Sequence, residues 1–212
     1  MNRMWHWPDG LSQDSQRRYR CASKTPLDRA TFDRFVRAVN TNPNKGGGHG
    51  SDDSPRLLAH FVADGLLDLS RPDMAGVVFD VWTNVNVPRD YLEEDDWQTL
   101  FEANGYSHVG LAAERPTEAV LLYRGCTYPG RFGMAWTPDL EVARRFAYDE
   151  IRGRLIGQVY TATVEPEYLL AFNATERAQL VPGIELDAES EYLVDSRGLS
   201  DENVTLFEVS RP

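Results

Sequence analysis

Gly133-Met134-Ala135-Trp136-Thr137-Pro138-Asp139-Leu140-Glu141-Val142-Ala143-Arg144-Arg145-Phe146-Ala147 is the stretch that decides the fold of the second half of this chain. Residues 132–137 read as a short apolar strand. Thr137-Pro138-Asp139 is typical of a helix start, with a hydroxyl cap, a proline at the first helical position and an acid in the first turn. The apolar residues that follow recur at helical spacing and give one apolar face, namely Leu140, Ala143, Phe146 and Ala147. The stretch predicts a strand that runs directly into a helix.

Strands are expected on both sides of this helix, and helices are expected in the first half of the chain. The β-branched and alternating runs that predict strands lie at 119–123, 155–164, 168–172, 192–194 and 204–209. Helices are expected from Thr25-Pro26, from Ser54-Pro55 and over 89–103, whereas the run 77–81 fits a strand or a helix end. The fold class is therefore α+β, with a helical N-terminal half packed on a strand-rich core. The expected divisions are an irregular lead-in over 1–24, a helical region over 25–115 and a strand-rich region over 116–212.

Composition excludes several classes of function. The 212 residues are 42% hydrophobic and 26% charged, and the net charge of −11 argues against tight nonspecific binding to nucleic acid. The chain has no apolar run of about 20 residues and no apolar signal-peptide core, so we expect a cytoplasmic protein with no membrane partner. Two distant cysteines and four scattered histidines lack metal-ligand spacing, so no metal is expected.

Three segments could supply the chemistry of breaking a nicotinamide–ribose bond. The transition state resembles an oxocarbenium ion, which a carboxylate stabilises, whereas a pyrophosphate suits the donor fork of an arginine and a nicotinamide ring needs a flat wall. Arg124 ends an apolar strand, Trp136 and Thr137 end the next strand, and Glu189 and Glu191 are spaced to share one side of a strand.

These segments resemble the arginine–serine–glutamate branch of the ADP-ribosyltransferase superfamily over about residues 117–210. The similarity lies in Tyr123-Arg124-Gly125, in the strand and helix quoted above, and in Glu189-Ser190-Glu191 before a closing hairpin. The resemblance implies a split β-sheet core, NAD as co-substrate and no metal. One departure is Ala135, which stands where the family has its first serine, so the hydroxyl that braces the glutamate is absent or comes from Thr137.

The resemblance also implies roles for individual residues. Glu191 would be the catalytic glutamate, Glu189 the upstream acid that helps to select the acceptor, and Arg124 would contact the NAD phosphates or the nicotinamide ribose. The implied cofactor site consists of Tyr123, Arg124, Gly125, Trp136 and Thr137.

Three functions follow as alternatives. The first is a mono-ADP-ribosyltransferase that uses NAD to modify a macromolecular acceptor, either a protein or a nucleic acid. The second is an N-glycosidase on the same fold, acting either as an NAD glycohydrolase or as a DNA glycosylase that excises a flipped base. The third is a noncatalytic nucleotide-binding module, which Ala135 favours.

Overall fold

The protein has an α+β fold in which the helices and the strands are largely segregated along the chain. The computed structural model describes residues 26–40, 54–85, 87–148, 157–174 and 190–209. The chain divides into two compact units, Met1–Gly105 and Tyr106–Pro212. All described strands belong to the second unit. The boundary between the helical and the strand-rich regions was expected after residue 115, but this point falls inside the second unit. Two short strands before residue 115 belong to a sheet whose other strands come after it.

The first unit is helical. Its described elements are α2 (Arg29–Asn40), α3 (Ser54–Ala63), η1 (Pro72–Met74), α4 (Val77–Thr83), η2 (Pro88–Asp90) and α5 (Glu94–Asn104). The run 77–81, which fitted a strand or a helix end, is helix α4, and its valines are buried. Burial against the neighbouring helices outweighs the modest strand preference of β-branched residues. No helix in the described ranges is long and apolar enough to span a lipid bilayer.

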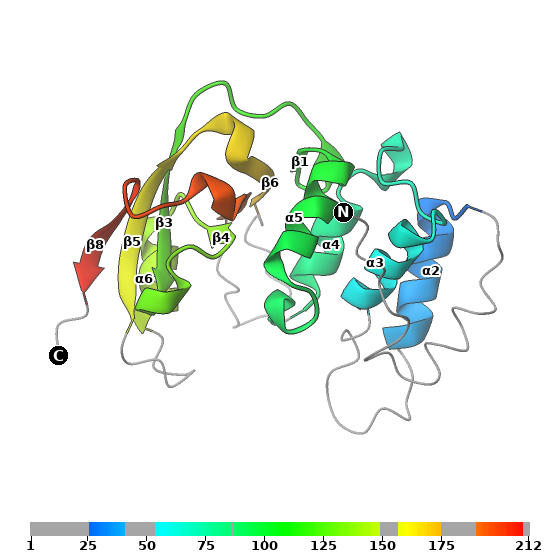
Figure 1. The fold of residues 1–212 in the computed structure, drawn as a ribbon, viewed down its shortest axis with the longest axis horizontal. Helices are drawn as coiled ribbons and strands as arrows, with labels where there is room; N and C mark the ends of the chain where they lie inside the picture. Colours follow the sequence, from blue (N-terminus) through cyan, green and yellow to red (C-terminus); the bar gives the residue numbers. More distant parts are fainter. Residues whose placement is uncertain (1–25, 41–53, 86, 149–156, 175–189, 210–212) are drawn as a thin grey trace, which may run out of the picture. The chain divides into compact units, whose positions relative to one another are not determined.

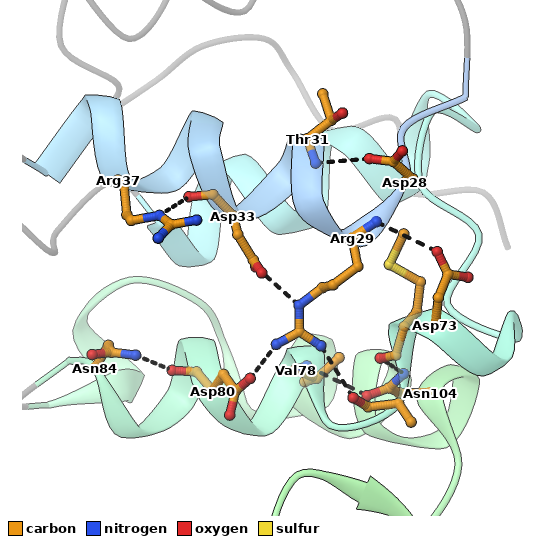
Figure 2. Close-up of polar contacts among 12 residues, drawn as sticks. Asp28, Arg29, Thr31, Asp33, Arg37, Asp73, Val78, Asp80, Asn84 and Asn104 are labelled. Carbon is orange, nitrogen blue, oxygen red and sulfur yellow. Dashed lines mark hydrogen bonds and ion pairs between the residues drawn. The ribbon is translucent and has the colours of Figure 1, made fainter.

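Arg29 ties α2 to α4 within this unit (Figure 2). Its guanidinium donates to the carboxylate of Asp33 at 2.9 Å, to the carbonyl of Ala75 at 3.1 Å and to the carboxylate of Asp80. Burial raises the pKa of Asp80 above its ordinary value, and the nearby Arg29 opposes that rise. This cluster is a structural brace between helices.

The described residues of the second unit form two β-sheets and one α-helix (Figure 1). One sheet has the order β2-β1-β6-β7-β4, and the other has the order β3-β5-β8. The bounds are β1 (Ser107–His108), β2 (Leu111–Ala112), β3 (Val120–Cys126), β4 (Ala135–Trp136), α6 (Leu140–Tyr148), β5 (Gln158–Val164), β6 (Leu169–Ala174), β7 (Ser190–Val194) and β8 (Val204–Val209). A single antiparallel bridge between Tyr123 and Thr137 joins β3 to the end of β4 and so links the two sheets.

Helix α6 packs closely on β3 and β5 (Figure 1). Ala143 and Ala147 bury their methyl groups against Val159. Gly125 approaches so closely that an added Cβ would lie 1.8 Å from the carbonyl oxygen of Ala143. A Cβ added at Gly157 would likewise lie 1.8 Å from the carbonyl oxygen of Ala147. Only glycine permits this separation between strand and helix.

The residue that caps α6 differs from the one expected from the sequence. Helix α6 begins at Leu140, and the Asp139 carboxylate accepts hydrogen bonds from the backbone N–H groups of Glu141 at 2.8 Å and Val142 at 3.4 Å. Asp139 is therefore the N-cap, and the expectation that Thr137 caps the helix is wrong. A carboxylate directly before the first turn can accept two of the N–H groups that the helix leaves unpaired.

Candidate functional site

The three segments singled out from the sequence lie on neighbouring strands. The backbone N–H groups of Tyr123 and Thr137 each donate to the other residue's carbonyl, at 2.7 and 2.9 Å. Strand β4 pairs with β7 through Ala135 opposite Leu193 and Trp136 opposite Tyr192. Continuing that antiparallel register by one residue brings Thr137 opposite Glu191. The arginine, the serine-like and the glutamate segments therefore meet across three adjacent strands.

Strand alternation divides their side chains between two faces. Residues that pair directly across antiparallel strands point to the same face, and successive residues of a strand point to opposite faces. Tyr123, Thr137 and Glu191 consequently share one face. Arg124 shares the other face with Trp136 and Tyr192. The three segments are brought together, but the arginine and the glutamate leave their strands in opposite directions.

The side chain of Arg124 braces the chain that leads into β4. Its Nε donates to the carbonyl oxygen of Gly130 at 2.8 Å, and Nη1 donates to the carbonyl oxygen of Ala135. Nη2 lies so close to Gly133 that an added Cβ there would be 2.4 Å away. A planar fork of donors suits two backbone carbonyls as well as it suits a pyrophosphate. The geometry gives Arg124 a positioning task in the turn between β3 and β4.

Trp136 lies inside the core of the second unit. Its side chain is 2% exposed, and its indole N–H donates to the carbonyl oxygen of Gly133 at 2.8 Å. It belongs to a cluster with Leu122, Tyr160 and Val194. Trp136 was expected to offer a flat wall to a nicotinamide ring, but the structure places the ring among core residues.

Thr137 and Tyr123 lie beside α6. Thr137 is 6% exposed, and its hydroxyl oxygen accepts a hydrogen bond from the backbone N–H of Asp139 at 3.1 Å. The Tyr123 ring meets the Phe207 ring edge-on at a centroid distance of 5.4 Å and packs against α6. Both side chains thus help to hold α6 on the sheet. Gly125, another residue of the expected cofactor site, provides the close contact with α6 described above.

Glu191 lies in β7 directly opposite Asn173 of β6, and both residues are half-buried. We define the polar row as Tyr123, Thr137, Glu191 and Asn173, which follow one another across β3, β4, β7 and β6. The row presents a phenol, a hydroxyl, a carboxylate and an amide on one face of neighbouring strands. Thr137 and Tyr123 are engaged beside α6, whereas the half-buried carboxylate of Glu191 and amide of Asn173 are suited to the hydroxyls and developing positive charge of a ribose. The expected upstream acid, Glu189, lies outside the described residues.

The opposite face is aromatic near Glu191. Tyr192 stacks on Phe172 at a centroid distance of 4.2 Å, and the His108 ring lies tilted to Phe172 at a centroid distance of 5.0 Å. Burial raises the pKa of Tyr192, and burial together with the nearby Tyr192 raises the pKa of Tyr106 to about 12. Both phenols are therefore protonated at neutral pH.

The turn between β3 and β4 carries a second stabilising contact. The guanidinium of Arg131 lies 3.9 Å from the ring centroid of Tyr128 and 4.1 Å from that of Phe132. It also donates to the carboxylate of Asp201 at 2.9 Å. This arrangement was not predictable from the sequence, because Asp201 is remote from Arg131 along the chain. The cation–π contacts and the ion pair of Arg131 stabilise the same turn whose carbonyl groups accept hydrogen bonds from Arg124.

Residues outside the polar row supply little further chemistry. Cys126 is a free thiol whose pKa is raised by burial, although the hydrogen bond and charge of Arg124 oppose that rise. No group of three His, Cys, Asp or Glu side chains in the described ranges is arranged to hold a metal ion. Asn173 is the residue of the polar row that sequence reasoning missed. A single asparagine near a strand end has no distinguishing pattern, and only the strand register brings it beside Glu191.

Comparisons with known proteins add no family assignment. No protein-family model matches the chain, and no curated protein or solved structure matches it either.

Proposed function

We propose that the second unit binds NAD and transfers its ADP-ribosyl group to a macromolecular acceptor. The observation that supports the proposal is the meeting of three sequence-distant segments: Tyr123 bridges to Thr137 at the end of β4, and β4 pairs with β7 up to Tyr192, the neighbour of Glu191. The split of the unit into two sheets joined by one bridge agrees with the ADP-ribosyltransferase-like core that the motifs suggest.

Glu191 carries the chemical step in this proposal. Its carboxylate stabilises the positive charge that develops on the ribose as the C1′–N bond to nicotinamide breaks. The bonding electron pair leaves with nicotinamide, which departs as a neutral ring. A nucleophile of the acceptor then forms a bond to C1′ and releases its proton. The step requires a carboxylate with a fixed orientation, and a half-buried strand position offers one.

Arg124 has a different task in this proposal from the one that the resemblance implies. Two of its nitrogens hold the carbonyls of Gly130 and Ala135, and this fixes the turn that leads into β4. Arg124 thus acts as a positioning residue for Trp136 and Thr137. Trp136 supports the strand from within the core, and Thr137 supports it at the start of α6.

The test uses NAD carrying one label on the nicotinamide and another on the adenosine. The full-length protein should release nicotinamide and attach the adenosine label to protein or nucleic acid. Glu191→Gln should reduce release by about 10²–10³-fold, because the near-isosteric amide removes the charge and little else. Glu167→Gln, the same change at an exposed glutamate, is the matched control and should keep full activity.

The other outcomes identify the alternative functions. Nicotinamide release without attached label would indicate an NAD glycohydrolase. Abasic sites formed in DNA without NAD would indicate base excision, and NAD binding without release would indicate a noncatalytic module. Equal activity of Glu191→Gln and the wild-type protein would show that another carboxylate acts.

A further inference from the structure

The neighbours of Glu191 differ sharply in what they can offer its carboxylate. On the β4 side, Ala135 lies on the same face as Glu191, because it pairs with Leu193 two residues further along β7. A methyl group cannot donate a hydrogen bond. Thr137 is nearly fully buried, and its hydroxyl oxygen accepts the backbone N–H of Asp139, the residue before α6. Between these two residues of the β4 side, the Thr137 O–H is the one side-chain donor for a carboxylate.

The β6 side offers an amide. Asn173 and Glu191 form a directly opposed pair in the antiparallel ladder between β6 and β7, so their side chains point to the same face. Opposed Cβ atoms lie about 4.5–5.5 Å apart, which is within reach of a hydrogen bond from an asparagine Nδ2 to a glutamate oxygen. The ladder continues through Phe172 opposite Tyr192 and Ala171 opposite Leu193. These stacked and buried pairs fix the register on which the Asn173–Glu191 pair depends.

We propose that Asn173 is the positioning residue for Glu191, whose carboxylate accepts a hydrogen bond from the Asn173 amide. The amide favours the ionised carboxylate and holds its orientation on the polar row. Its role in turnover rests on the proposed ribosyl transfer, whereas the contact itself does not. Asn173 lies on β6 and Ala135 lies on β4, the two strands on either side of β7. The Asn173 amide thus supplies the hydrogen bond that a hydroxyl at position 135 would supply.

The contact can be tested without activity. In full-length protein labelled with ¹³C at the glutamate side-chain carboxyl, the Glu191 signal is assigned by its loss in Glu191→Gln. Asn173→Ala should move the titration midpoint of this signal upward by about one pH unit, as expected when one hydrogen bond to a charged group is lost. Asn173→Asp should move it further, because it sets a like charge opposite Glu191. Thr163→Ala, an exposed change on β5, is the control and should leave the midpoint unchanged.

The outcomes separate the contact from the activity. If the midpoint stays within about 0.2 pH units of wild type in both Asn173 variants, the proposal is overturned. It is also overturned if Thr137→Val moves the midpoint and Asn173→Ala does not. If Asn173→Ala does not fold, Asn173→Ser, which keeps a shorter donor, should give a smaller upward shift. Absence of nicotinamide release by the wild-type protein would remove the proposed function but leave the titration result to decide on the contact.

Turnover gives a second readout. If the wild-type protein releases nicotinamide, Asn173→Ala should lower kcat about tenfold with little change in KM for NAD, because orientation matters most in the transition state. The acid limb of its pH profile should move upward with the titration midpoint, and Asn173→Ser should recover part of kcat. A rise in KM with unchanged kcat would contradict the positioning role.

Discussion

Gly125 offers the most direct test of how β3 and α6 fit together. An alanine at this position would place its Cβ 1.8 Å from the carbonyl oxygen of Ala143 and 2.5 Å from the amide nitrogen of Ala147. Side-chain Cβ atoms essentially never approach another atom closer than 3.0 Å. The obstacles are backbone atoms of a helix, so no rotation of a side chain can relieve the clash. Strand and helix must move apart by more than 1 Å, from 1.8 to at least 3.0 Å.

The energetic cost follows from what that movement opens. Ala143, Ala147 and Val159 are almost fully buried in the contact between α6 and the sheet. A gap of about 1 Å forfeits up to half of the dispersion energy across such a contact. Overpacking against an immobile neighbour costs about 3 kcal/mol at the upper end of the usual range. For a unit of this size, we expect Gly125→Ala to lower Tm by roughly 12 °C or more.

The measurement pairs calorimetry with amide hydrogen exchange on the full-length chain. Gly125→Ala should lower the Tm of the second unit and speed exchange at Ala143 and Ala147, which lie in α6. Gly130→Ala is the matched control, because its nearest neighbour would be the Cys126 Cβ at an ordinary 3.5 Å. That control should melt within about 2 °C of wild type or slightly higher, since alanine restricts the unfolded chain. Equal Tm values for the two variants, with α6 amides protected as in wild type, would refute the close approach.

Two further predictions concern the first unit. Arg29→Met keeps the apolar stem but removes the donors to Asp33 and Asp80, so the free energy of unfolding in urea should fall by about 1–2 kcal/mol. The figure is modest because both carboxylates are only partly buried, and a change below about 0.3 kcal/mol would contradict the brace. Because the pKa of Asp80 is raised in the folded state above its ordinary 3.8, the stability it contributes is fully present below that value and is lost as pH rises through the folded pKa. Urea unfolding from pH 3 to 6 should therefore show Asp80→Asn gaining on wild type as pH rises, and a constant difference would exclude the raised pKa.

Helix faces were predictable from the sequence, and so was the start of α3 at Ser54-Pro55, whereas the residue that caps α6 was not. The apolar spacing in α3, α5 and α6 follows from a periodicity that each segment carries by itself. Thr137-Pro138 was read as a cap, but the acceptor at the start of α6 is Asp139. Thr25, the other threonine read as a cap, lies outside the described residues. Asp28 accepts from the N–H of Thr31 at the start of α2, just as Asp139 does in α6. Pro138 favours an extended conformation at Thr137, so α6 begins after the next good acceptor, Asp139.

The site was predictable at the level of segments and not of side-chain directions. The strands that carry Arg124, Trp136 and Glu191 were visible in the sequence, and the structure aligns them. The expected strand end at Arg124 is wrong, because β3 continues to Cys126. Which face each side chain occupies depends on a register fixed by strands far apart along the chain. A shift of one residue exchanges the two faces. For the same reason, neither the opposition of Asn173 to Glu191 nor the ion pair of Arg131 with Asp201 could be read from the sequence.

The residues that carry the family resemblance are mostly those that build the frame around Glu191. Gly125 sets the approach of α6, Trp136 fills the core behind β4, and Arg124 fixes the turn before it. Each would be needed to place a strand end beside β7, whatever reaction followed. Variants at these three positions should therefore lower stability and activity together, and they cannot distinguish a frame from an active site. Glu191 can be changed with little effect on the frame, because it is half-buried on one face of β7. Loss of nicotinamide release with unchanged Tm in Glu191→Gln is consequently the result that would separate chemistry from architecture.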